Sequence, residues 1–129
     1  MVACGLDFGT SNTTLGVSTA DGPALVALEG ASVTIPSAIF YTPNGAPPAV
    51  GRAAIRAYVD GTNGRLMRSL KSVLGSSLIH ESTAIGRGRV SFRDVISQYV
   101  GIVKSRAEEV SGAPIDAVVH GRPVHFVDS

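Results

Sequence analysis

Cysteine, aromatic residues and charge are all scarce in this chain of 129 residues. A single cysteine, Cys4, excludes an internal disulfide, and its apolar neighbours predict a buried side chain rather than a reactive thiol. Aromatic residues make up 5% of the chain and the formal net charge is +1, which argues against a nucleic-acid partner. No stretch approaches the roughly 18 consecutive apolar residues of a membrane-spanning helix. We therefore expect a cytoplasmic protein without a membrane or nucleic-acid partner.

Three common catalytic signatures are also missing. The histidines lack the H-x-x-x-H spacing of a helical metal site and have no cysteine nearby; they are His80, His120 and His125. No Gly-x-Ser-x-Gly segment supplies a serine nucleophile, and no G-x-x-x-x-G-K-[ST] segment forms a P-loop. The sequence therefore argues against a histidine metal site, a serine hydrolase and a P-loop enzyme.

Strand patterns fill the first third of the chain. Short apolar or Thr/Val-rich runs alternate with Gly, Asp and Pro turn signals, which predicts a β-meander. The expected strands cover residues 2–8, 13–18, 24–28, 32–35 and 37–41. With 44% apolar residues, the chain has the composition of one globular domain or of part of one.

Helical patterns follow after Gly51. We expect one helix over residues 52–59 and a second through Leu66, Leu70, Val73 and Leu74, which recur at helical spacing. The clearest helix spans residues 91–111, where Ser91 and Asp94 resemble a capping box and Gly112 with Pro114 supplies the stop. A strand is expected over residues 115–119, as in an α/β unit. One long helix would leave a sheet face bare and apolar, so we expect a fragment of a longer protein.

The end of the first expected strand holds the clearest candidates for ligand-binding residues. Asp7 is followed, after Phe8, by small turn residues, Gly9 to Asn12. Backbone N–H groups of such a turn can converge on a phosphate, while the carboxylate holds a hydrated divalent cation. The same residues can also form an ordinary hairpin turn in which Asp7 and Asn12 only satisfy local N–H groups. Spacing alone leaves both interpretations open.

A family resemblance begins at this turn. Residues 5–13 (GLDFGTSNT) resemble the phosphate-binding opening of the seventy-kilodalton, DnaK-type heat-shock chaperones, within the actin-like ATPase superfamily. Further similar segments follow in family order: 35–40 (IPSAIF), 50–54 (VGRAA), 69–75 (SLKSVLG) and 117–124 (AVVHGRPV). The last segment departs from the usual strand end of the family and is more similar to YegD-type chaperones. The resemblance implies a ribonuclease-H-like first half-lobe, with an α+β insertion over about residues 37–90 of a fragment comprising residues 1–129.

The resemblance also implies ATP and Mg²⁺ as cofactors and a role for particular residues. Asp7 is expected to orient hydrated Mg²⁺, and Lys71 to reach the γ-phosphate and the attacking water, so these two are the expected catalytic residues. The expected phosphate-binding residues are Gly9, Thr10, Ser11, Asn12 and Thr13. Arg122 and Pro123 match the region that relays nucleotide state in the family. The alternative for Lys71 is an ordinary solvated lysine.

The implied function is ATP binding and slow hydrolysis by a molecular chaperone, with unfolded peptide bound by a further C-terminal region. Two alternatives stay open at this point: a sugar-type kinase of the same superfamily, and a non-catalytic interaction module. Because the superfamily binds phosphates between two lobes, we expect residues 1–129 alone to bind ATP weakly or not at all. We also expect self-association, through the exposed sheet face and the strand edge after Val119.

Overall fold

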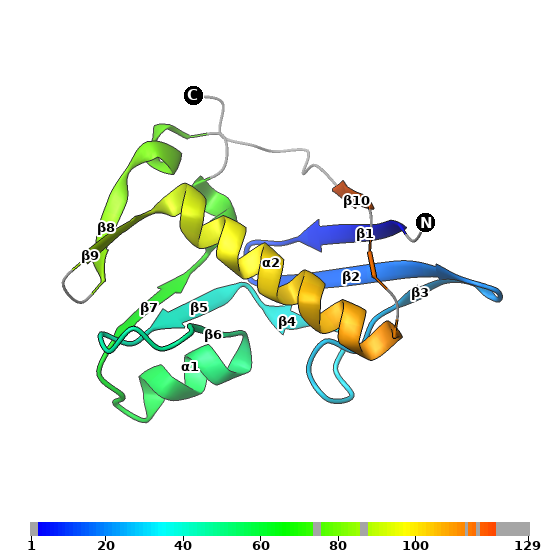
Figure 1. Ribbon diagram of the computed structural model, residues 1–129, viewed down its shortest axis with the longest axis horizontal. Helices are drawn as coiled ribbons and strands as arrows, with labels where there is room; N and C mark the ends of the chain where they lie inside the picture. The colour runs from blue at the N-terminus through cyan, green and yellow to red at the C-terminus, as the bar shows by residue number, and fades with distance from the viewer. Residues whose placement is uncertain (1–2, 74–75, 86–87, 113, 116, 121–129) are drawn as a thin grey trace.

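The computed structural model describes residues 3–73, 76–85, 88–112, 114–115 and 117–120. Over these ranges a mixed sheet carries one long helix, with a smaller layer beside it (Figure 1). The main sheet contains, in spatial order, β10 (Ala117–His120), β1 (Ala3–Phe8), β2 (Asn12–Thr19) and β3 (Gly22–Leu25), while β4 (Ile35–Pro36) pairs with β2. Because β1 runs parallel to β10 and antiparallel to β2, the expected mixed α/β architecture is confirmed.

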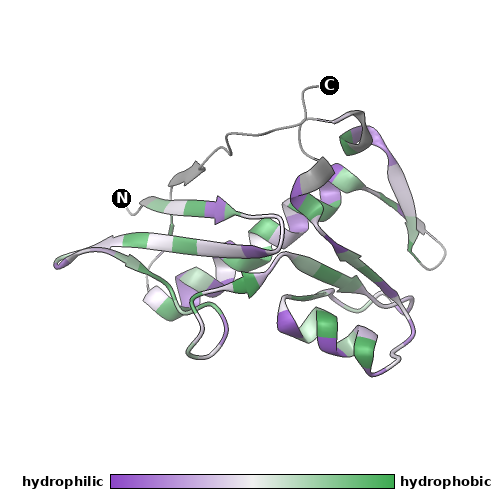
Figure 2. Ribbon diagram, turned by 180° about the vertical axis from the view of Figure 1, so that it is seen from behind, coloured by the Kyte–Doolittle hydropathy of each residue, from purple (hydrophilic) through white to green (hydrophobic). Residues whose placement is uncertain are grey.

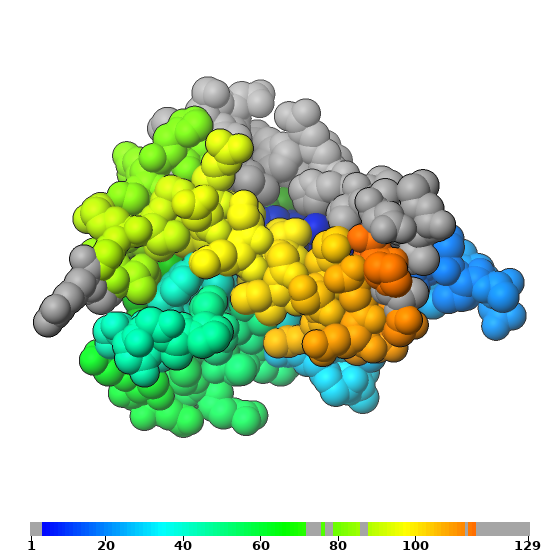
Figure 3. Space-filling model, in the orientation of Figure 1, coloured from blue at the N-terminus to red at the C-terminus, as the bar shows by residue number. Residues whose placement is uncertain are grey.

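The long helix α2 (Phe92–Ser111) covers one face of the main sheet (Figure 1). Its buried positions, among them Val95, Tyr99 and Val103, pack in one core with Leu6 and Phe8 of β1. The Ser91 hydroxyl accepts a hydrogen bond from the Asp94 N–H, and Gly112 adopts the left-handed conformation that ends the helix. The outer face of α2 forms much of the surface seen in Figure 3. The predicted start and end of this helix are confirmed.

The opposite face of the main sheet, the open face, is turned toward the viewer in Figure 2 and is not covered by α2. Gly5 and Asp7 of β1 pair with Gly16 and Thr14 of β2, and a methyl group added at Gly5 would have no neighbour within 4 Å. The large apolar side chain on this part of β3 is Leu25, which is 56% exposed. On β1 and β2 this face thus carries small and polar residues, with Leu25 of β3 as an exposed apolar side chain beside them, and self-association through it stays a prediction.

The smaller layer follows β4 in the chain. Its elements are β5 (Ala38–Tyr41), β6 (Ala49–Val50), α1 (Arg52–Val59), β7 (Arg65–Arg68), the 3-10 helices η1 (Leu70–Val73) and η2 (Ser77–His80), and the hairpin β8 (Ser82–Ile85) with β9 (Gly88–Ser91). β5 is buried on both faces, because Ile39 and Tyr41 join the main core while Ala38 and Phe40 pack in a second cluster with Ala54 of α1. The assignment of residues 37–90 as an insertion stays a prediction.

Two predictions about secondary structure are wrong. Leu66 lies in β7, which pairs antiparallel with β5, and η1 starts only at Leu70, so pairing with a distant strand overrides the local helical spacing. Instead of the strand pair over residues 24–28 and 32–35, an isolated bridge joins Glu29 and Ser32. Ile35 pairs with Thr13 and is fully buried, so the main core recruits this segment.

Other sequence expectations can be placed only in part. Cys4 is buried as predicted, and burial raises the pKa of its thiol. Leu74, Arg122, Pro123 and His125 lie outside the described residues. Within the described helices, no segment is both long and apolar enough to span a membrane.

Candidate functional site

The β1–β2 turn is a tight connection that requires glycine at its start. The Gly9 N–H donates to the Asn12 carbonyl oxygen at 2.9 Å. A side chain at position 9 would overlap that same oxygen, so any larger residue would open the turn. Asp7 lies at the end of β1 on the open sheet face, and Thr10, Ser11 and Asn12 are exposed. The turn therefore presents a carboxylate and a row of small polar side chains to the same open region.

Ser37, between β4 and β5, supports this turn from below. Its N–H donates to the Ser11 carbonyl oxygen at 2.9 Å, and its hydroxyl donates to the Gly9 carbonyl oxygen at 2.8 Å. Two carbonyl oxygens of the turn are thereby held toward the protein interior. Since carbonyl oxygens repel anions, this arrangement favours an anionic ligand on the outer side of the turn.

Thr13, the last of the expected phosphate-binding residues, is buried. Its side chain is 1% exposed and its hydroxyl lies 2.8 Å from the Ser37 hydroxyl. The Thr13 hydroxyl is therefore directed into the interior, and the assignment of Thr13 as a phosphate-binding residue stays a prediction. Gly9, Thr10, Ser11 and Asn12 remain as the surface of the turn.

A small cavity of about 60 Å³ connects the turn with the end of β7. Thr10 and Ser11 line it from one side, and Arg68 and Ser69 from the other. The helix expected through Leu66 and Leu70 would have contained Arg68, so the sequence did not predict that Arg68 lies next to the turn. Arg68 stands three residues before Lys71 in the sequence. Its place beside the turn can be inferred only once β7 is known to be a strand.

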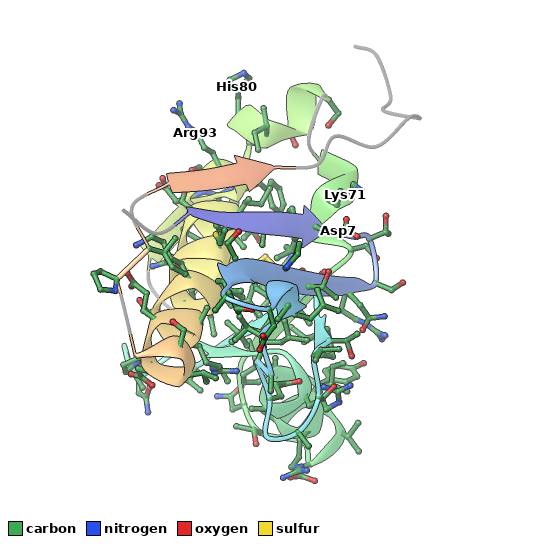
Figure 4. The ribbon with its side chains drawn as sticks, turned by 90° about the vertical axis from the view of Figure 1, so that its right-hand side faces the viewer. Asp7, Lys71, His80 and Arg93 are labelled. Atoms are coloured by element: carbon green, nitrogen blue, oxygen red, sulfur yellow. The ribbon has the colours of Figure 1, made fainter. Side chains whose placement is uncertain are left out.

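Lys71 reaches this neighbourhood through an irregular connection. Ser69 has a φ of 54°, in the left-handed region that a non-glycine residue rarely adopts, and it separates β7 from η1, which carries Lys71. Lys71 is partly buried. In Figure 4, Asp7 and Lys71 lie at the same end of β1, whereas His80 and Arg93 lie toward the opposite end. The structure thus groups the two expected catalytic residues and leaves His80 apart from them.

The charges at this end of the sheet suit a phosphorylated ligand with a cation. Asp7 supplies a carboxylate, and Arg68 and Lys71 supply two positive charges. No cluster of three or more metal-ligating side chains occurs among the described residues. A divalent cation here would therefore depend on water and on oxygens of the ligand as well as on Asp7.

A second hollow is larger than the cavity beside the turn. This groove of about 640 Å³ lies between Pro47 and Pro48 and the outer side of α2, at Gly101, Ile102 and Ser105. None of the expected site residues lines it. Size alone therefore does not identify the site, and the turn with its carboxylate and cations is the better candidate.

A comparison with protein families settles which family this arrangement belongs to. The family model described as Hsp70 protein matches residues 3–119, a span that includes both the turn and Lys71. The chain belongs to the Hsp70 family. Its matched residues form an ATP-binding portion of a heat-shock-type chaperone, and the Hsp70 family has the actin-like ATPase fold and binds ATP, typically with Mg²⁺. The resemblance deduced from residues 5–13 and the later segments is confirmed at the level of the family.

Proposed function

We propose that the β1–β2 turn binds the β- and γ-phosphates of ATP and that Lys71 assists hydrolysis of the γ-phosphate. Thr10, Ser11 and Asn12 would supply donors, and Asp7 would hold a hydrated Mg²⁺. The cation would neutralise phosphate charge. The observation that carries this proposal is the inward hold of the Gly9 and Ser11 carbonyl oxygens by Ser37, which supports an anion on the outer side.

The proposed role of Lys71 follows from how phosphoryl transfer is catalysed. Charge on the phosphoryl oxygens shifts during the reaction, so a positioned cation accelerates it by stabilising the transition state more than the bound nucleotide. The cavity that joins Thr10 and Ser11 to Arg68 and Ser69 supports an approach of η1 to the turn. Transfer to water, rather than to a sugar, is favoured by membership of the Hsp70 family.

Several finer assignments rest on the family resemblance. They are a YegD-type position within the family, an insertion over about residues 37–90 and unfolded peptide as the partner of a further C-terminal region. A cytoplasmic location is proposed from the sequence composition instead. Self-association of residues 1–129 is also proposed, through sheet edges and through the open face.

Asp7→Asn in the full-length protein tests the proposed site. Loss of the carboxylate should weaken Mg-ATP binding by about tenfold to a hundredfold, because a charge-assisted contact is worth about 1.5–3 kcal/mol. The measurement is calorimetric titration with ATP, with and without Mg²⁺, and the Mg²⁺-dependent part of the affinity should shrink most. Asp21→Asn is the matched control, because Asp21 is exposed in the turn between β2 and β3. Equal affinities in both variants would remove Asp7 from the site.

A further inference from the structure

Beneath the turn lies a buried chain of hydroxyl groups that the proposed reaction does not use. Tyr99 of α2, Thr13 of β2 and Ser37 are 0%, 1% and 2% exposed. The Tyr99 hydroxyl lies 3.0 Å from the Thr13 hydroxyl and 3.0 Å from the Pro36 carbonyl oxygen. The Thr13 hydroxyl in turn lies 2.8 Å from the Ser37 hydroxyl, which donates to the Gly9 carbonyl oxygen at 2.8 Å. The chain thus runs from helix α2 to the first residue of the turn.

The hydrogens of this chain have a defined direction. The Gly9 carbonyl oxygen can only accept, so the single hydrogen of Ser37 is used there. Ser37 must then accept from Thr13, and Thr13, whose hydrogen is thereby used, accepts from Tyr99. Tyr99 shares its hydrogen between Thr13 and the Pro36 carbonyl oxygen. The three hydroxyl groups therefore form one directed sequence of hydrogen bonds that begins at Tyr99 and ends at the Gly9 carbonyl oxygen.

The surroundings keep Tyr99 as a neutral donor. Burial raises the pKa of its hydroxyl, and the charges that act on it are Glu29 and Arg106, of opposite sign. No buried side-chain nitrogen or oxygen lacks a hydrogen-bond partner within the described part of the chain. Removal of the Tyr99 hydroxyl would take this donor away from the Thr13 hydroxyl and from the Pro36 carbonyl oxygen.

We propose that Tyr99 is a positioning residue, which holds the Gly9 end of the turn inward through Thr13 and Ser37 and so links helix α2 to the phosphate-binding turn. The inference rests on the proposed function, because the effect assigned to Tyr99 is to hold the turn in its phosphate-binding shape before the ligand binds. A donor set fixed in advance binds and stabilises charge without the cost of reorganisation. Tyr99 itself has no contact with the outer surface of the turn.

Tyr99→Phe in the full-length protein is the main test, because it removes one oxygen and keeps the ring that packs 5.6 Å from Phe8. Tyr41→Phe is the matched control: Tyr41 also donates its hydroxyl to α2, but to the Gln98 side chain and not to Thr13 or Ser37. Amide hydrogen exchange at Gly9, whose N–H closes the turn, should be about tenfold faster in Tyr99→Phe and unchanged in Tyr41→Phe. ATP affinity should fall by about the same factor in Tyr99→Phe alone.

A double variant shows whether Tyr99 acts through Ser37. Ser37→Ala removes the direct donor to Gly9, so Tyr99→Phe added to it should change Gly9 exchange and ATP affinity by less than twofold. Independent, multiplying effects of the two substitutions would overturn the relay. So would Gly9 exchange or ATP affinity in Tyr99→Phe that matches the Tyr41→Phe control.

The two proposals fail in different measurements. If the unaltered protein does not bind ATP, the proposed function fails. Hydrogen exchange at Gly9 requires no nucleotide and still decides whether Tyr99 shapes the turn. If ATP binds and exchange is insensitive to Tyr99→Phe, the positioning role fails and the proposed function stands.

Discussion

The two sides of the proposed site are built in different ways. The turn side connects two paired strands of the main sheet and rests on the buried hydroxyl groups of Thr13, Ser37 and Tyr99. The lysine side is a four-residue 3-10 helix that follows a left-handed residue, Ser69, at the end of β7. The turn is thus fixed by the core, whereas Lys71 is positioned by a short, irregular segment.

Because of this difference, we expect substitutions on the two sides of the site to affect nucleotide binding and the reaction rate differently. A turn that is part of the core should couple ligand affinity to folding stability, because the same hydrogen bonds serve both. A left-handed residue such as Ser69 costs about 1–3 kcal/mol, a strain that functional segments often carry. We therefore expect substitutions at the turn to change stability and affinity together, and substitutions on η1 to change the reaction rate with little change in stability.

The largest expected effect belongs to the lysine side. Lys71→Ala in the full-length protein should slow single-turnover ATP hydrolysis by about 100- to 1,000-fold, the usual effect of one preorganised donor in a transition state. ATP affinity and the melting temperature should change far less, because the contact strengthens only as charge shifts during the reaction. Lys104→Ala is the control, since Lys104 lies on α2 in an ion pair with Glu108. A rate equal to that of the control would identify Lys71 as an ordinary surface lysine.

A smaller effect, of a different kind, is expected on the turn side. Gly9→Ala forces a methyl group against the Asn12 carbonyl oxygen and must open the turn. Overpacking of this kind costs about 1–3 kcal/mol, and ATP affinity should fall together with the free energy of unfolding. Urea denaturation and nucleotide titration of the same samples measure both quantities.

Gly5→Ala provides the contrast within the same strand. A methyl group at Gly5 meets no atom within 4 Å, so the free energy of unfolding should stay close to that of the unaltered protein. If Gly9→Ala lost affinity while keeping the stability of Gly5→Ala, the turn would not be coupled to the core as we describe.

Local sequence was sufficient to predict the turn side and the long helix. The acid near the end of β1 and the glycine and small polar residues after it indicate a tight turn by themselves. Ser91 and Gly112 mark the ends of α2 through backbone chemistry that needs no distant partner. The helix over residues 52–59 follows the same logic and matches α1. Each of these features depends on residues that are close together in the chain.

The other features depend on distant contacts and escaped prediction. Leu66 has helical spacing to Leu70, yet β7 gains a full antiparallel pairing with β5, which no local pattern reveals. Tyr99 fits the apolar stripe of α2, and its hydrogen bond to Thr13 spans 86 positions in the sequence. Ser37 was recognised within a family-like segment but its contacts with Gly9 and Ser11 required the fold.

The smallest expected effect concerns a contact far from both sides of the site. The Glu108 carboxylate on α2 accepts hydrogen bonds from the Ile115 N–H at 2.7 Å and from the Lys104 ammonium group at 3.2 Å. These contacts lower the pKa of Glu108, with the Ile115 N–H as the largest cause. A lowered pKa in the folded state means that the contact stabilises the fold above the ordinary carboxyl pKa and that this contribution is lost as the pH falls through the lowered value.

Glu108→Gln isolates that contribution, because the amide cannot ionise but keeps an oxygen for the Ile115 N–H. The unaltered protein should melt at a slightly higher temperature than Glu108→Gln near about pH 7, and the difference should narrow as the pH falls through the lowered pKa of Glu108. Thermal melts across this pH range measure the difference, and Glu109→Gln, one position along on the exposed side of α2, is the control. Hydrolysis rates should be the same in all three proteins, since Glu108 ties the end of α2 to the segment before β10 and not to the turn or to η1. A difference in melting temperature that persists unchanged at acidic pH would show that the charge of Glu108 is irrelevant and that only its shape matters.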